Sequence, residues 1–126
     1  MTSSTPEHPS HKFSIGIDLG TTHSVLSYIE PPLNELDEPT QNILAIPQLT
    51  AAGEIENKLQ LPSFIYQAHS AELSKGATVL PWTAEPEHLV GEIARNRGRK
   101  TPLRLVSSAK SWLCHTSIDC KAPILP

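Results

Sequence analysis

Apolar and polar residues alternate strictly near the start of the chain. Positions 13, 15, 17 and 19 are Phe, Ile, Ile and Leu, and the residues between them are small or polar. A period of two residues is typical of a β-strand with one apolar face. Residues 24–29 (SVLSYI) are β-branched and aromatic, which predicts a second strand. The short Gly-Thr-Thr segment before it predicts that the two strands form a hairpin.

The middle of the chain predicts short antiparallel strands separated by turns. Residues 30–41 are acidic and rich in proline, which predicts a loop because proline has no N–H to give to a sheet. Further strands are expected at residues 43–49, 56–61 and 63–67. Pro47 interrupts the first of these, which predicts that it is an edge strand.

Helices are expected only in the last third of the chain. Gly91 permits a tight step into a short helix at residues 92–96. Thr101 and Pro102 form a favourable helix start, because threonine can cap backbone donors and proline fits the first helical position. The apolar residues that follow fall on one stripe of a 3.6-residue period, namely Leu105, Val106, Ala109, Trp112 and Leu113. A helix is therefore predicted there, with Lys110 at the edge of the stripe.

Composition narrows the class of protein. The chain has 126 residues, enough for one domain, but only 38% are hydrophobic and 12 are proline, which indicates a modest core and many connections. The net charge is -3, and nucleic acid is not expected as a partner. One short basic run is expected to be a solvated helix end and loop rather than an anion site, with Arg95, Arg97, Arg99, Lys100 and Arg104.

Neither a secretory signal nor a membrane span is expected from the pattern of apolar residues. Residues 1–12 are polar and lack the apolar core of a secretory signal, so a disordered tail is expected. No apolar run reaches the roughly 18 residues of a membrane span, and we expect a soluble, cytoplasmic protein without a membrane partner. Cys114 and Cys120 fit neither a redox pair nor, with His115, a zinc site, so free thiols are expected.

The turn between the first two strands has the composition of a phosphate-binding loop. Gly20, Thr21 and Thr22 offer backbone N–H donors, an unobstructed approach and hydroxyl groups. Asp18 is expected at the exit of the strand, on the same side as Gly16 and Gly20, where a carboxylate can order the water shell of a nucleotide-bound Mg²⁺. A plain hairpin turn, in which Asp18 only accepts hydrogen bonds from the turn, explains the same residues equally well.

The letters around this turn resemble a known family. Residues 15–24 read IGIDLGTTHS, which resembles the phosphate-1 signature IDLGTTxS of heat shock protein 70 (DnaK-like) ATPases. Residues 53–65 and the LVGEIA segment at 89–94 are similar to two later segments of that family, in the same order. The SAKSWL segment at 108–113 stands where the family has a helix containing KRLIG.

The resemblance is uneven along the chain. It covers most of residues 13–113 but is strong mainly at the phosphate loop. His23 replaces the usual Asn or Tyr, the acidic proline loop is unusual, and Ser111 and Trp112 replace the residues that follow the family's lysine. These departures indicate a divergent member, and no site role is assigned to His23.

The resemblance implies an α/β fold of the ribonuclease H-like, actin-like ATPase type. Residues 13–126 would be an incomplete N-terminal part of the nucleotide-binding domain, comprising the first hairpin and a peripheral subdomain after the tail at residues 1–12. The parent protein would hydrolyse ATP to ADP and phosphate. The 126-residue chain alone is expected to be inactive, since it lacks the family's second phosphate loop and adenosine-binding glycines.

The resemblance also implies roles for individual residues. Lys110 would be the catalytic lysine that holds the attacking water or the γ-phosphate. Gly20, Thr21 and Thr22 would contact the β- and γ-phosphates of ATP, and Asp18 would act in catalysis through Mg²⁺-bound water or an adjacent K⁺. Without the resemblance, Lys110 is an ordinary lysine beside an apolar stripe, with its ammonium in water.

The complete protein would act as a chaperone if it belongs to this family. Its partners would be ATP or ADP, unfolded polypeptide clients, a J-domain co-chaperone and a nucleotide exchange factor. Two alternatives remain open. One is a sugar or small-molecule kinase of the same superfamily, which shares a looser DxGTT or DxGxT motif; the other is a truncated, non-catalytic remnant.

Overall fold

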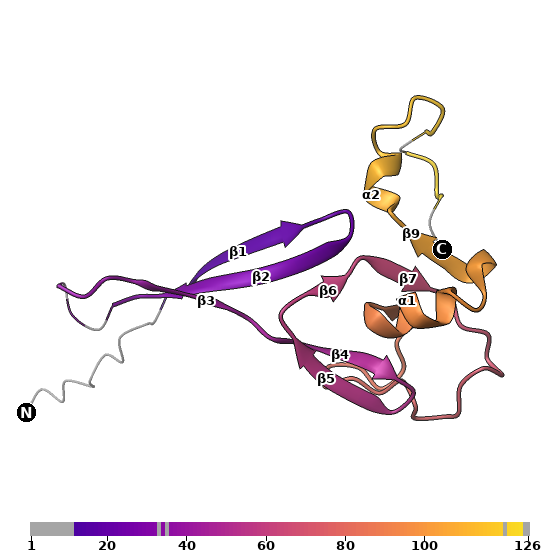
Figure 1. The fold of residues 1–126 in the computed structure, drawn as a ribbon, viewed down its shortest axis with the longest axis horizontal. Coiled ribbons are helices and arrows are strands. Elements are labelled where there is room, and N and C mark those ends of the chain that lie inside the picture. The colour runs from indigo at the N-terminus through magenta and orange to yellow at the C-terminus, as the bar shows by residue number, and fades with distance from the viewer. Residues whose placement is uncertain (1–11, 33, 35, 120, 125–126) are drawn as a thin grey trace, which may run out of the picture.

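The structure is a computed structural model that describes residues 12–32, 34, 36–119 and 121–124. Within them the fold is mixed α/β, with mostly small antiparallel strands and few helices. Figure 1 shows the first strands projecting as a long arm from a second part that contains the longer helix. Residues 1–11 of the expected N-terminal tail, and Cys120, lie outside the described residues, while Cys114 is exposed and free.

The arm is a sheet built around the predicted hairpin. Strand β1 (Ser14–Leu19) pairs antiparallel with β2 (His23–Glu30), which confirms the prediction from the two-residue period. Strand β3 (Thr40–Ile43) pairs with the other edge of β2, and the short β6 (Leu61–Pro62) pairs with the start of β2. All six residues of β1 are exposed, so neither face of this strand is covered by the described part of the chain.

A second hairpin joins the arm to the rest of the fold. Strand β4 (Ile46–Ala51) pairs antiparallel with β5 (Glu54–Lys58), and Gly53 turns the chain between them with φ of 75°. This left-handed backbone conformation favours glycine because it has no Cβ. The two strands form a sheet of their own, so Pro47 lies in an edge strand, as predicted.

The core forms where the longer helix covers a three-stranded sheet. Strand β7 (Phe64–Tyr66) lies between β8 (Leu89–Val90) and β9 (Leu105–Ser107), and α1 (Glu92–Gly98) packs against β7 and β4 (Figure 1). Gly91 has φ of 77° at the start of α1, which confirms the predicted tight step. The buried apolar residues are Leu49, Tyr66, Leu80, Leu89, Ile93 and Ala94.

The helix predicted after Thr101 is wrong in its first half. The chain forms a single 3₁₀ turn, η1 (Pro102–Arg104), then strand β9, and only then the short α2 (Ala109–Trp112). Leu105 and Val106 pair with the open edge of β7, and such sheet contacts override the local helical spacing. Ser108 then adopts a left-handed conformation, with φ of 53°, between β9 and α2.

The described helices are short. The longer of those named above, α1, has seven residues and lies on the core. Within the described part of the chain, none of the helices has both the length and the apolar character needed to cross a membrane.

Candidate functional site

The loop between β1 and β2 makes a close backbone turn that requires glycine at its first position. A Cβ atom added to Gly20 would lie 2.2 Å from the carbonyl oxygen of His23. Side chains do not approach main-chain atoms this closely, so any larger residue would force the loop to shift. The predicted phosphate loop is therefore a tight turn, in which the carbonyl group of His23 occupies the space that a side chain at position 20 would need.

Ser63 fixes the shape of this loop from a distant part of the sequence. Its hydroxyl donates a hydrogen bond to the carbonyl oxygen of Gly20 at 2.8 Å. Its backbone N–H donates to the carbonyl oxygen of Thr22, also at 2.8 Å. Because both acceptors are loop carbonyls, the two bonds hold the loop at each end against the segment that joins β6 to β7.

Lys110 approaches the same loop from α2. Its Nζ donates a hydrogen bond of 2.6 Å to the carbonyl oxygen of Leu19, the last residue of β1, across 91 positions of sequence. A lysine ammonium has three donors. One is used by Leu19, which leaves donors for a second acceptor at the exit of β1.

A cavity of about 260 Å³ lies between the loop and α2. Gly20, Thr21 and Lys110 line it together, with the hydroxyl-bearing Ser24 and Ser63. The other walls are mainly apolar, formed by Leu61, Pro62, Phe64, Ile65, Val90, Val106 and Ala109. A cationic side chain and hydroxyl groups beside a backbone turn are suited to hold a small anion. The volume lies below the roughly 300 Å³ at which pockets for drug-sized ligands begin, so it fits a phosphate group better than a whole nucleotide.

Asp18 and Thr22 do not line this cavity. Asp18 is exposed and pairs with Val25 across the hairpin, whereas Ser24, which does line the cavity, pairs with Leu19. Successive side chains of a strand point to opposite faces. Asp18 therefore lies on the face of the hairpin opposite to Ser24, and the structure brings together only part of the predicted site.

The residues around Asp18 offer no ready-made metal site. Across the part of the chain that the structure describes, no group of three or more His, Cys, Asp or Glu side chains is placed to hold a metal ion. A single carboxylate fits Mg²⁺ only as a partner of metal-bound water, with the phosphates of a nucleotide as the main ligands. This is the indirect role that the sequence predicts for Asp18.

Ser63 and Ser24 are the site residues that the sequence interpretation did not single out. Ser63 follows Pro62 within residues 53–65, one of the segments that resembles the heat shock protein 70 family, but no role was inferred for its hydroxyl. Ser24 closes the IGIDLGTTHS motif. A serine flanked by proline at a strand start is a weak signal alone, since its partner lies 43 positions earlier.

No protein-family model, curated protein or solved structure matches the chain. A functional interpretation therefore depends on the phosphate-loop motif and on the geometry around residues 20–24.

Proposed function

We propose that this chain binds the phosphate tail of ATP at the loop of residues 20–22, as part of the ATPase domain of a heat shock protein 70-type chaperone. The observation that supports it most strongly is the 2.6 Å hydrogen bond from Lys110 Nζ to the carbonyl of Leu19. The phosphate-loop motif predicts the loop and the family resemblance predicts the lysine, and the two lie side by side although 91 positions separate Lys110 from Leu19.

In this proposal the loop and the lysine bind different parts of the phosphate tail. Backbone donors and hydroxyl groups at Gly20 and Thr21 hold phosphate oxygens, and Lys110 supplies a positive charge to the γ-phosphate. A fixed positive charge stabilises the negative charge that develops on the transferring phosphoryl group. The tight turn at Gly20 supports this use because it places the backbone of Gly20 and Thr21 along the wall of the cavity that Lys110 also lines.

Asp18 would act from the other side of the loop. Bound with the nucleotide, Mg²⁺ neutralises charge on the phosphates. The Asp18 carboxylate would hold water that belongs to the metal, while Thr22 would contact the phosphates through its backbone and hydroxyl. The phosphate tail would then lie over the end of β1, between Asp18 on one face and Lys110 on the other.

The same proposal includes a chaperone role for the complete protein. The exposed β1, with Ile15, Ile17 and Leu19 each more than 60% exposed, is consistent with a hairpin that packs against further structure in an actin-like ATPase domain. ATP turnover would then drive the binding of unfolded polypeptides, assisted by a J-domain co-chaperone and a nucleotide exchange factor. Phosphate transfer to a sugar would instead identify a kinase of the same superfamily.

The test uses ATP binding to the native chain and to two matched lysine variants. A charge-assisted hydrogen bond contributes roughly 1.5–3 kcal/mol, so Lys110→Ala should weaken binding of Mg·ATP about tenfold or more in calorimetric titration. Lys75→Ala removes an exposed lysine that does not line the cavity, and it should leave the affinity unchanged.

A competition experiment tests which part of the nucleotide is bound. Because the cavity is too small for a whole nucleotide, tripolyphosphate should displace ATP and adenosine should not. Binding that adenosine displaces, or that Lys110→Ala does not weaken, would contradict the proposal.

A further inference from the structure

A second cavity, of about 430 Å³, lies on the opposite face of β2 from the phosphate loop cavity. His23 and Val25 of β2 line it, whereas Ser24 lines the smaller one, and alternate residues of a strand point to opposite faces. Its apolar walls are Val25, Ile43, Leu59 and Pro62. Its polar rim is formed by His23, Lys58, Gln60, Glu92 and Arg95.

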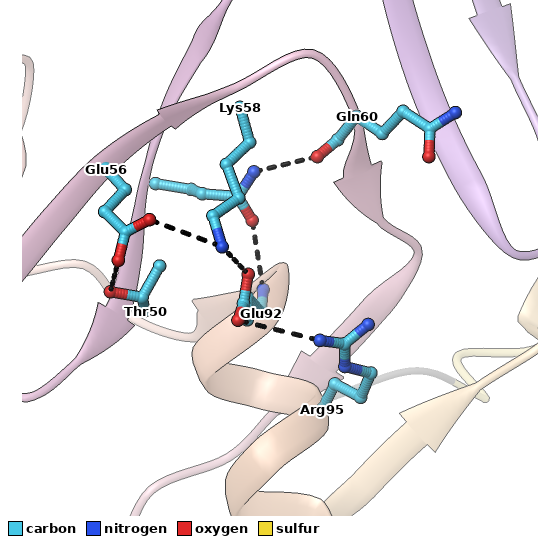
Figure 2. Close-up of polar contacts among 7 residues, drawn as sticks. Thr50, Glu56, Lys58, Gln60, Glu92 and Arg95 are labelled. Carbon is cyan, nitrogen blue, oxygen red and sulfur yellow. Dashed lines mark hydrogen bonds and ion pairs between the residues drawn. The ribbon is translucent and has the colours of Figure 1, made fainter.

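The two cations on this rim differ in how well they are paired. Lys58 Nζ lies 2.7 Å from Glu92 Oε2 and 3.4 Å from Glu56 Oε2, so two carboxylates share it (Figure 2). The hydrogen bond from Lys58 to Glu92 is the main reason that the pKa of Lys58 is raised above its ordinary value of 10.5. The backbone N–H of Glu92 also donates to Gln48 Oε1 at 3.1 Å, which fixes the residue at the start of α1.

Arg95 is less completely paired than Lys58. Figure 2 shows it on the far side of Glu92 from Lys58, and its Nη2 lies 3.7 Å from Glu92 Oε1. This distance is too long for a hydrogen bond. The Nε atom of Arg95 is shielded from solvent and has no hydrogen-bond partner among the described residues. Arg95 lines the cavity, and its pairing with Glu92 is an ion pair too long for a hydrogen bond, which leaves the terminal N–H groups of its guanidinium for an anion there.

We propose that this cavity binds an aliphatic carboxylate, with the chain of the ligand against the apolar walls and its carboxylate on Arg95. Planar guanidinium groups pair with carboxylates through two parallel hydrogen bonds, which Arg95 can donate from its two terminal nitrogens. Glu92 keeps its 2.7 Å hydrogen bond to Lys58, and its 3.7 Å ion pair with Arg95 is the weaker of its two contacts. This inference does not depend on the proposed ATP site, because Gly20, Thr21 and Lys110 line the other cavity and Asp18, although it shares the face of Val25, does not line this one.

The charge around the cavity favours a ligand with one negative charge. Glu92 lines the cavity and Glu56 lies next to it through Lys58, so a doubly charged phosphate ester would meet more repulsion than a monocarboxylate. The volume is within the range of pockets that enclose small organic ligands, and four aliphatic or proline side chains suit a short hydrocarbon chain.

Octanoate is a suitable probe, and methyl NMR gives a local readout. Titration of the native chain should produce saturable shifts in the methyl signals of Val25, Ile43 and Leu59. Octan-1-ol, which has the same chain length without the charge, should bind at least about tenfold more weakly, since a charge-assisted pair is lost. Octyl phosphate should also bind more weakly than octanoate.

Two arginine variants on the same helix separate this site from a general charge effect. Arg95→Gln should weaken octanoate binding about tenfold or more. Arg97→Gln removes the same charge from α1, but Arg97 lies 3.7 Å from Glu72 and does not line the cavity, so octanoate affinity should be unchanged. Equal affinities of the native chain and Arg95→Gln would overturn the proposal. Equal binding of octanoate and octan-1-ol by the native chain would do so without any variant.

Discussion

Replacing Ser63 with alanine removes one of the two hydrogen bonds that hold the phosphate loop in shape. The lost bond is the one from the hydroxyl to the carbonyl of Gly20, at 2.8 Å. The backbone bond from residue 63 to the carbonyl of Thr22 remains, since alanine keeps the N–H. The variant therefore loosens one end of the loop without removing its contact with the β6–β7 segment.

The expected loss in free energy of unfolding follows from the type of hydrogen bond and from its environment. A neutral hydrogen bond contributes roughly 0.5–1.5 kcal/mol, and this site is only partly buried, so water can reach the freed carbonyl. We expect the free energy of unfolding to fall by about 1 kcal/mol, which corresponds to a loss of about 4 °C in melting temperature for a chain of this size. Affinity for Mg·ATP should fall severalfold, because Gly20 and Thr21 no longer hold one geometry.

Urea denaturation and calorimetric titration of Mg·ATP measure the two effects separately. Ser70→Ala is a matched control, because Ser70 is exposed and does not line the phosphate loop cavity. An unchanged free energy of unfolding for Ser63→Ala would refute the structural part of the reasoning. Lower stability with unchanged ATP affinity would refute the link between this bond and binding.

Two further changes test the loop and the ionic network. Gly20→Ala places a Cβ atom 2.2 Å from a main-chain carbonyl oxygen and should cost about 1–3 kcal/mol of stability together with ATP affinity, as denaturation and titration would show. Gly16→Ala is its control, since the nearest atom, at 2.9 Å, is a flexible side-chain hydroxyl that can move; equal losses in both would contradict the steric argument. The raised pKa of Lys58, due first to Glu92, means that the ion pair stabilises the fold below pH 10.5 and that this contribution is lost as pH rises above it. The stability difference between the native chain and Lys58→Met should therefore shrink above pH 10.5, and a constant difference would show that the charge of Lys58 is not its cause.

The sequence predicted those parts of the fold that depend on neighbouring residues. The alternation at residues 13–19 predicted β1, and the glycine at position 91 predicted the tight entry into α1, because period and backbone freedom are local properties. Leu105 and Val106 were wrongly assigned to a helix, since their spacing fits a helix stripe as well as a strand. Only the pairing with β7, formed elsewhere in the chain, decides between the two.

The candidate site also contains residues that the sequence predicted and contacts that it did not. The order Asp-Leu-Gly-Thr-Thr pointed to a phosphate loop, and the likeness to a family pointed to Lys110. The bond from Ser63 to Gly20 and the ion pair of Lys58 with Glu92 had no local pattern to reveal them. Each joins residues far apart in the sequence, by 43 and 34 positions, and such partners become visible only when the chain is folded.

The hydrogen bond between Lys110 and Leu19 also bears on the order of events during protein synthesis. Contacts between residues far apart in sequence form late, because the intervening chain must first be ordered. The ribosome completes the β1–β2 turn early, whereas Lys110, which lines the cavity, is added 91 residues after Leu19. A nascent chain therefore displays the Gly-Thr-Thr turn for some time before it has the lysine that, in our proposal, holds a nucleotide there.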